Sequence, residues 1–106
     1  PEIKDWVFTA ALSGSDTEKT ITMTGNDGTI VTARLTSTWG NLGYGSYYLN
    51  EPGVNNADNV TVNGKAIAKE NTSGTITFDY NSGNVIVDMT INGTKYVGTS
   101  TNTLFS

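Results

Sequence analysis

The sequence predicts a single all-β domain over residues 1–106, and three observations lead to this fold class. Apolar residues recur in short runs at every second position, as in strands that bury one face. The chain contains 18 Thr, 12 Asn, 12 Gly and 8 Ser, which favours strands with Thr-rich exposed faces and frequent turns. Charged residues make up 15% and hydrophobic residues 36% of the chain, a balance typical of folded rather than disordered proteins.

Three strands are expected in the first part of the chain. The first covers about residues 5–12, where Trp6, Phe8, Ala10 and Leu12 share one face. The second lies near residues 20–24, where Ile21 and Met23 alternate with threonines. The third runs over residues 29–39, with one face carrying Val31, Ala33, Leu35 and Trp39.

Turn residues divide the second half of the chain into hairpins. Asn63-Gly64 and Asn92-Gly93 predict type I′ turns, because this turn needs positive φ at both central positions. With four-residue loops at 71–74 and 81–84, residues 59–100 become a five-stranded meander. The predicted cross-strand rows on its apolar face are Val60, Ile67, Phe78, Val87, Gly98 and Lys69, Ile76, Met89, Tyr96. One apolar and one mixed face are typical of an antiparallel sheet packed on one side.

About eight or nine short strands therefore form an antiparallel, mostly hairpin-connected meander. The long connections at 40–45 and 51–59 permit a change of sheet, which favours a two-sheet sandwich of the jelly-roll or Ig-like kind. The alternative is a small up-and-down β-barrel. The segment NVIVDMTINGTKY, residues 84–96, resembles the closing strand and hairpin of carbohydrate-binding β-sandwich modules. This resemblance covers 13 residues and implies no ligand-binding residues.

Composition excludes several classes of function. The chain has no His and no Cys, so it lacks the usual general base at neutral pH, thiolate nucleophiles and disulfides. Asp79 and Asp88 are expected on one face of adjacent strands, where solvated carboxylates balanced by Lys65 and Lys95 are favoured over a catalytic pair. We therefore expect no enzymatic activity. A net charge of −4 with scattered cations argues against nucleic acid, and no apolar run is long enough for a transmembrane segment.

The segment TSTWGNLGYGSYYLNEPG, residues 36–53, is the main candidate for ligand binding. Tyr47 and Tyr48 are adjacent in a strand, so they must point to opposite faces and one of them is expected to be exposed. Tyr44 lies between two glycines that allow a corner in the chain. Aromatic faces beside amides suit sugar rings. The predicted ligand-binding residues are Tyr44, Tyr48, Trp39, Asn41 and Asn50, although the phase of Trp39 also fits a core ring.

The following segment is a weaker candidate for calcium. Its ligands would be Glu51, Asn55, Asn56, Asp58 and Asn59. Calcium accepts carboxylate, amide and backbone oxygens together, but the spacing is not that of an EF-hand. Asn and Asp are also the ordinary residues of turns. No cofactor other than this calcium ion is expected.

Three functions fit these observations. The first is a non-catalytic extracellular or surface module that binds a polysaccharide, or a similar polar surface ligand, through the aromatic Gly-rich loop. The second is a structural subunit of a virion, fimbria, filament or adhesin, whose partners are neighbouring copies in a larger assembly. The third is a lipocalin-like carrier of a small apolar ligand. Each places the chain outside the cell, at a cell surface or in a virion.

Overall fold

The computed structural model describes residues 1–38, 40 and 42–105, with side chains described as far as Thr101. Its elements are β1 (Glu2–Ile3), β2 (Phe8–Gly14), β3 (Glu18–Gly25), β4 (Ile30–Ser37), β5 (Gly45–Leu49), β6 (Asn55–Val62), β7 (Lys65–Ala66), the 3-10 helix η1 (Lys69–Asn71), β8 (Thr72–Phe78), β9 (Val85–Ile91) and β10 (Thr94–Phe105). Among the described residues no helix has the length and apolar character needed to cross a bilayer.

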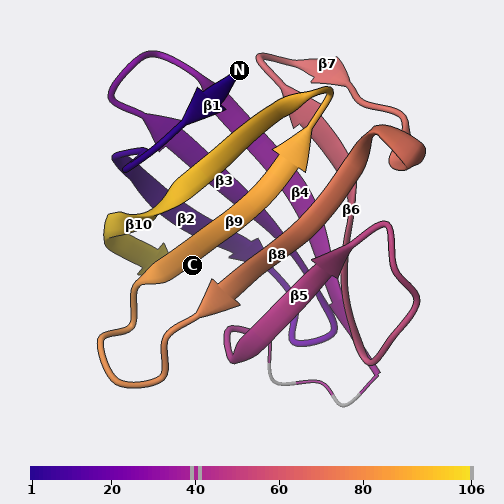
Figure 1. Ribbon diagram of the computed structural model, residues 1–106. Helices are drawn as coiled ribbons and strands as arrows, with labels where there is room; N and C mark the ends of the chain where they lie inside the picture. The colour runs from indigo at the N-terminus through magenta and orange to yellow at the C-terminus, as the bar shows by residue number, and fades with distance from the viewer. Residues whose placement is uncertain (39, 41, 106) are drawn as a thin grey trace.

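Eight of these strands close into a barrel (Figure 1). Their order around the barrel is β10, β2, β3, β4, β6, β5, β8 and β9, and β9 pairs again with β10. The two-residue strands β1 and β7 are additions beside β10 and β6. The predicted all-β class is confirmed, whereas the predicted two-sheet sandwich is wrong and the alternative small barrel describes the fold.

Strand β10 closes the barrel because it pairs with β9 in its first part and with β2 in its last part. Its first part, Thr94 to Thr99, pairs antiparallel with β9. Its last part pairs parallel with β2 from Ser100 to Phe105, with a shift in register between Ser100 and Thr103. Strands β5 and β6 are also parallel. The barrel is therefore only partly up-and-down. Hairpin reasoning could not predict these parallel pairs, because a tight turn joins antiparallel strands only.

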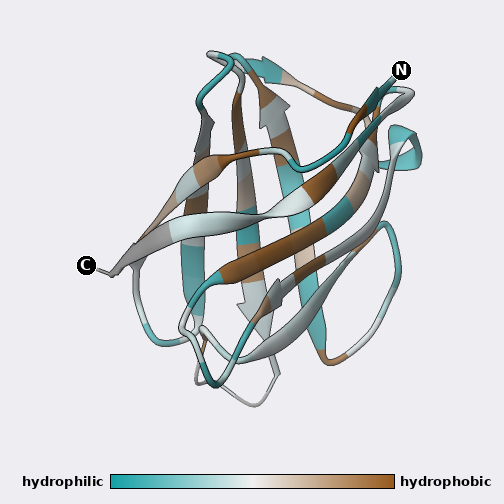
Figure 2. Ribbon diagram, turned by 60° about the vertical axis from the view of Figure 1, so that its left-hand side comes forward, coloured by the Kyte–Doolittle hydropathy of each residue, from teal (hydrophilic) through white to brown (hydrophobic). Residues whose placement is uncertain are grey.

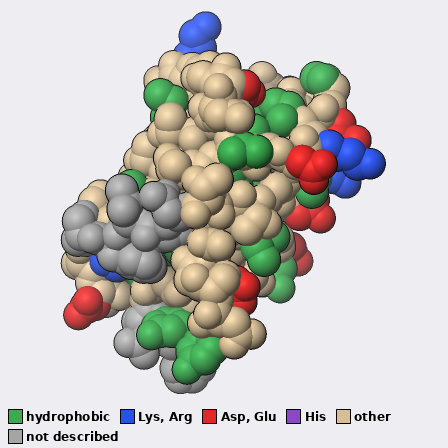
Figure 3. All heavy atoms as spheres, turned by 90° about the vertical axis from the view of Figure 1, so that its left-hand side faces the viewer, with side chains coloured by type: hydrophobic (Ala, Val, Ile, Leu, Met, Phe, Trp, Pro, Cys, Tyr) green, Lys and Arg blue, Asp and Glu red, His purple; other side chains and the backbone are tan. Residues whose placement is uncertain are grey.

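The interior of the barrel is filled by the alternate apolar side chains of its strands. Trp6, Phe8, Ala10 and Leu12 are all buried, as predicted for the first face, and so are Val31, Ala33 and Leu35 on β4. Trp39 lies outside the described residues. Figure 2 shows hydrophobic segments recurring along the strands around the barrel. One side of the molecule is covered mostly by uncharged polar side chains and backbone, with scattered hydrophobic side chains and a group of charged side chains at the right edge of the view (Figure 3).

The predicted hairpin registers are correct at the Asn-Gly turns and wrong between them. Asn63, Gly64, Asn92 and Gly93 all have positive φ, as type I′ turns require. Between β9 and β10 the predicted pairs Val87–Gly98 and Met89–Tyr96 are confirmed. At the first turn, the Ile67 N–H donates to the Val60 carbonyl, in agreement with the predicted pair.

The five-stranded meander over residues 59–100 is wrong for two reasons. Residues 69–71 form η1 instead of a hairpin loop, and β5 lies between β6 and β8. The connection after β8 spans six residues, because Phe78 pairs with Val85. This moves the partner of Val87 from the predicted Phe78 to Ile76.

Candidate functional site

Strand β5 presents one tyrosine to the core and the next to solvent. Tyr47 is fully buried, and its ring meets Phe78 edge-on at a centroid distance of 5.5 Å. Tyr48 is 44% exposed. The prediction that the adjacent tyrosines point to opposite faces is therefore confirmed. By the same alternation, Ser46 shares the outward face with Tyr48.

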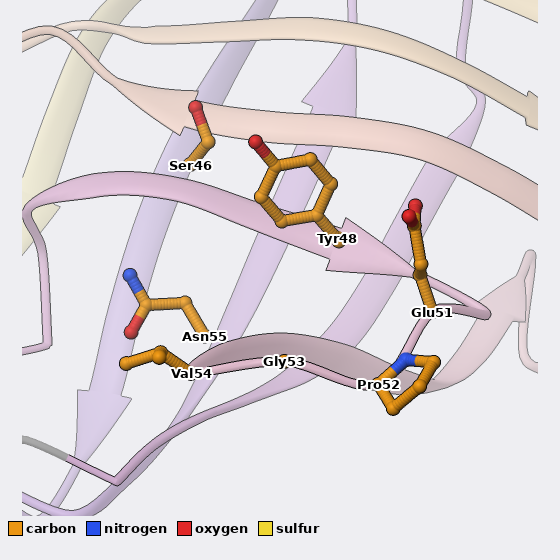
Figure 4. Close-up of a pocket in the computed structure, with 7 residues that line it drawn as sticks. All are labelled: Ser46, Tyr48, Glu51, Pro52, Gly53, Val54 and Asn55. Carbon is orange, nitrogen blue, oxygen red and sulfur yellow. The ribbon is translucent and has the colours of Figure 1, made fainter.

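Tyr48 lies in a hollow between β5 and the segment that leads into β6. This hollow has a volume of about 270 Å³ and is lined by Ser46, Tyr48, Glu51, Pro52, Gly53, Val54 and Asn55. Figure 4 shows Ser46 and Tyr48 on one side, Val54 and Asn55 on the other, and Glu51 with Pro52 at one end. The hollow forms here because β5 and β6 pair over only two positions, so the connecting residues stand away from the sheet.

Two smaller hollows continue from it along β6. The first, of about 120 Å³, shares Tyr48, Glu51 and Pro52 with it and reaches Asp58 and Lys69. The second, of about 190 Å³, shares Asp58 and Lys69 and extends to Asn59, Ile67 and Thr72. We call this series the β5–β6 groove.

Asp58, which lines the two smaller hollows of the groove, belongs to an ion pair. The Arg34 guanidinium donates to both carboxylate oxygens of Asp58, at 2.8 Å each. The two residues are cross-strand partners on β4 and β6. Hydrogen bonding and the negative charge of Asp58 raise the pKa of Arg34 above its ordinary value. Both side chains are about one-third exposed, so the pair orients polar groups at the surface more than it stabilises the fold.

A second aromatic surface lies at the start of β5. Tyr44 and Tyr80 are 56% and 83% exposed, and their ring centroids are 6.0 Å apart. They line a hollow of about 330 Å³ together with Leu42, Gly43, Asp79 and Gly83. Gly43 and Gly45 both have positive φ, which places Tyr44 at a corner of the chain, as the sequence indicates.

Hydrogen bonds hold the segments that carry these two rings. The Gly43 N–H donates to the hydroxyl of buried Tyr47 at 3.1 Å. In the loop after β8, the Asp79 carboxylate accepts from the Ser82 hydroxyl at 2.7 Å and from the Asn81 N–H at 3.0 Å. These bonds, that of Ser82 foremost, lower the pKa of Asp79 below its ordinary value of 3.8.

The Asp79 carboxylate should therefore stabilise this loop only at pH values at which it is ionised. Because the pKa is lowered in the folded state, the stabilisation is present above the unfolded value, near 4, and is lost as the pH falls through the folded value. A carboxyl-detected NMR titration is expected to give a midpoint for Asp79 below 3.8. Ser82→Ala should move this midpoint upward. A midpoint at or above 3.8 in the unaltered protein would contradict the role of the loop hydrogen bonds.

The structure brings most of the predicted site residues to this region but separates the two tyrosines. Tyr48 and Asn50 line the β5–β6 groove, whereas Tyr44 belongs to the hollow with Tyr80. Trp39 and Asn41, the other two predicted ligand-binding residues, lie outside the described part of the chain. The residues predicted as calcium ligands, Glu51, Asn55, Asn56, Asp58 and Asn59, all contribute to the groove.

Several of these oxygen atoms already have partners. Both carboxylate oxygens of Asp58 accept from Arg34, and the Asn56 amide donates to the Gly53 carbonyl at 2.9 Å. Over residues 1–38, 40 and 42–105, no group of three or more His, Cys, Asp or Glu residues could hold a metal ion. Calcium binding here stays a prediction, and Arg34 would compete with the ion for Asp58.

The expected arrangement of Asp79 and Asp88 is wrong. Asp88 lies opposite Thr75 on β8, while Asp79 is in the loop beyond the end of that strand. Lys95 lies 3.9 Å from Asp88, as expected for a solvated strand carboxylate. The error comes from the loop length, since a four-residue loop places Asp79 in the strand.

Tyr80 and Lys69 are among the contributors to these hollows that sequence reasoning missed. The four-residue loop expected at 81–84 places Tyr80 in a strand, whereas residues 79–84 form one loop. Asp79 followed three positions later by Ser82 is a turn signal that could have revealed it. Lys69 carried no comparable signal, because it was placed in a cross-strand row of the meander.

Comparison of the chain with protein-family models, with curated proteins and with solved structures finds no significant match. The function is therefore inferred from the residues of this chain.

Proposed function

We propose that this domain is a non-catalytic module that binds a glycan in the β5–β6 groove. The observation that carries the proposal is the half-exposed ring of Tyr48 in a hollow whose other walls are short polar and apolar side chains. An aromatic ring offers a flat apolar face to the C–H groups of a sugar. The amides of Asn50 and Asn55 and the carboxylate of Glu51 offer hydrogen bonds to its hydroxyls.

The burial of the ring's neighbours supports a preformed site. Tyr47 and Leu49, on either side of Tyr48, are buried in the barrel, so the backbone of β5 is fixed on its inner side. A ligand that binds a fixed surface loses less free energy to ordering of the protein. The proposed location is extracellular or at a cell surface, where polysaccharides are available.

The other two functions have less support. Alternate side chains of the strands fill the barrel interior, and the core residues are at most 8% exposed, whereas a lipocalin-like carrier needs internal space. Assembly through strand edges needs unpaired edge strands. Pairing of β9 with β10 closes the barrel, and the strands added beside it, β1 and β7, have two residues each.

The test is binding of the unaltered domain to a printed glycan array and to soluble polysaccharides in affinity gel electrophoresis. We would use mixed-linkage β-glucan, arabinoxylan and galactomannan as neutral polymers and polygalacturonate as an acidic one. Tyr48→Ala is expected to weaken binding about tenfold, because it removes one aromatic contact of roughly 1–1.5 kcal/mol. Tyr48→Phe should retain most of the affinity, since it keeps the ring.

Ile30→Ala is the matched control. Ile30 is 39% exposed, close to the value for Tyr48, but lies on β4 and lines none of the three hollows of the groove. It should bind like the unaltered protein. Repeating the measurement with EDTA tests the calcium prediction at the same time. The proposal fails if no glycan binds, or if Tyr48→Ala binds as well as Ile30→Ala.

A further inference from the structure

The Tyr44–Tyr80 hollow is a second aromatic surface that the β5–β6 groove does not include. Its two rings are the most exposed of the large hydrophobic side chains in the described part of the chain. They lie at 38° to one another with their centroids 6.0 Å apart. Exposed aromatic surface of this kind, rimmed by polar groups, is typical of binding sites.

The segments beneath the rings are held in place before any ligand binds. The Asp79 N–H donates to the Asn84 carbonyl at 2.8 Å, and the Gly83 N–H donates to the Asp79 carbonyl at 2.9 Å. The Asp79 carboxylate adds its bonds from Asn81 and Ser82, and Tyr47 holds Gly43 from the core side. A preformed surface lowers the ordering cost of binding.

A strip of hydroxyl groups connects this hollow to Tyr48. Ser46 pairs with Thr77 across β5 and β8, and their hydroxyls are 2.8 Å apart. Tyr48 pairs with Thr75 in the same way. The start of β5 and the loop after β8 lie at the same end of the barrel (Figure 1), so the tyrosine pair stands at the end of this strip.

The separation of the two aromatic positions indicates the size of the ligand. Tyr44 and Tyr48 are four positions apart, which corresponds to at most about 13 Å, and they line separate hollows. One sugar ring is shorter than this distance and cannot contact both positions. Hydroxyl groups between two aromatic surfaces suit a ligand that has a row of hydroxyls along its length.

The charges near the strip indicate a neutral ligand. Glu51 lines the hollow of Tyr48, and Asp79 lines the hollow of Tyr80. The whole chain carries a net charge of −4. Carboxylates at these positions repel an acidic polysaccharide, whereas they accept hydrogen bonds from neutral sugars.

We infer that Tyr44 and Tyr80 form a second subsite, and that the ligand is an internal stretch of a linear, neutral polysaccharide lying along the outer face of β5. This inference rests on the proposed glycan-binding function. It adds that several consecutive sugar units are recognised, and that a single terminal sugar is not the ligand.

The experiment measures affinity against chain length by isothermal titration calorimetry. The probes are cello-, xylo- and manno-oligosaccharides of two to six units, and the series that binds is followed in the variants. For the unaltered protein we expect the six-unit oligomer to bind at least about tenfold more tightly than the two-unit oligomer. Tyr80→Ala should remove this gain, and Tyr44→Ala should have the same effect. Tyr48→Ala should weaken short and long oligomers alike.

Ile86→Ala is the control, because Ile86 is 40% exposed on the neighbouring strand β9, is paired with Thr77, and lines neither hollow. Tyr80 is on a loop at the surface, so its removal should leave the circular dichroism spectrum unchanged. Equal affinity for two and six units, or a six-unit affinity that survives Tyr80→Ala, overturns the second subsite while leaving the glycan-binding function standing. Absence of binding to every glycan overturns both.

Discussion

Trp6→Ala is expected to lower the free energy of unfolding by about 3–5 kcal/mol, the usual cost of removing a large buried aromatic side chain. Trp6 is 2% exposed and precedes β2, and its side chain belongs to the core of the barrel. Its ring stacks on Phe8 at 4.6 Å and meets Tyr96 edge-on at 5.0 Å. The loss would be a large part of the 5–15 kcal/mol that stabilises a typical domain. Urea denaturation followed by circular dichroism measures it.

The polar edge of the same ring contributes a smaller part. The indole N–H donates to Asp27 at 3.2 Å, and Asp27 also accepts from the Thr29 N–H at 3.1 Å. Trp6→Phe keeps most of the ring and loses this bond, so it should cost about 1–2 kcal/mol. A cost below about 1 kcal/mol for Trp6→Ala would show that Trp6 does not hold this end of the barrel together.

Gly74→Ala is expected to lower the free energy of unfolding by about 2–4 kcal/mol. Gly74 has a φ of +95° within β8, where a side chain adds strain. A Cβ at this position would also clash with the Asp88 carbonyl oxygen and would lie 2.7 Å from the Met89 Cα, on the neighbouring strand. Backbone atoms cannot move aside without disturbing the β8–β9 ladder, so overpacking adds to the strain.

Gly28→Ala distinguishes backbone strain from overpacking, the two causes of the loss expected for Gly74→Ala. Gly28 has nearly the same φ, +92°, but nothing lies within 4 Å of a Cβ built there. It should cost only the conformational strain, roughly 1–2 kcal/mol. The same urea denaturation compares the two variants. Equal losses would mean that the close approach of β9 to Gly74 has no energetic consequence.

Local patterns predicted the strands and the buried faces, because burial of alternate side chains is a short-range property. The burial of Trp6 and Phe8 and the opposed directions of Tyr47 and Tyr48 follow from period two alone. The I′ turns follow from Asn-Gly pairs, because few other residues tolerate positive φ at both positions.

Barrel closure could not be predicted in this way. It depends on the parallel pairing of Ser100 with Phe8 and of Tyr48 with Asn56. The first pair joins opposite ends of the chain, and the second needs a connection that leaves the sheet and returns beside it. The site could not be predicted for the same reason, since it also depends on strand pairing. The groove exists because β5 and β6 pair at only two positions, and Tyr80 lies near Tyr44 because β5 pairs with β8.

Binding of glycan to the outer face of β5 can be measured residue by residue by NMR. Amide spectra of the ¹⁵N-labelled domain would be recorded during titration with the six-unit cello-, xylo- and manno-oligosaccharides. Shift changes are expected at Tyr44, Ser46, Tyr48 and Tyr80, with the outward positions of β2 and β3 unchanged. Shift changes confined to the opposite wall of the barrel, or none with any oligosaccharide, would contradict binding at this face.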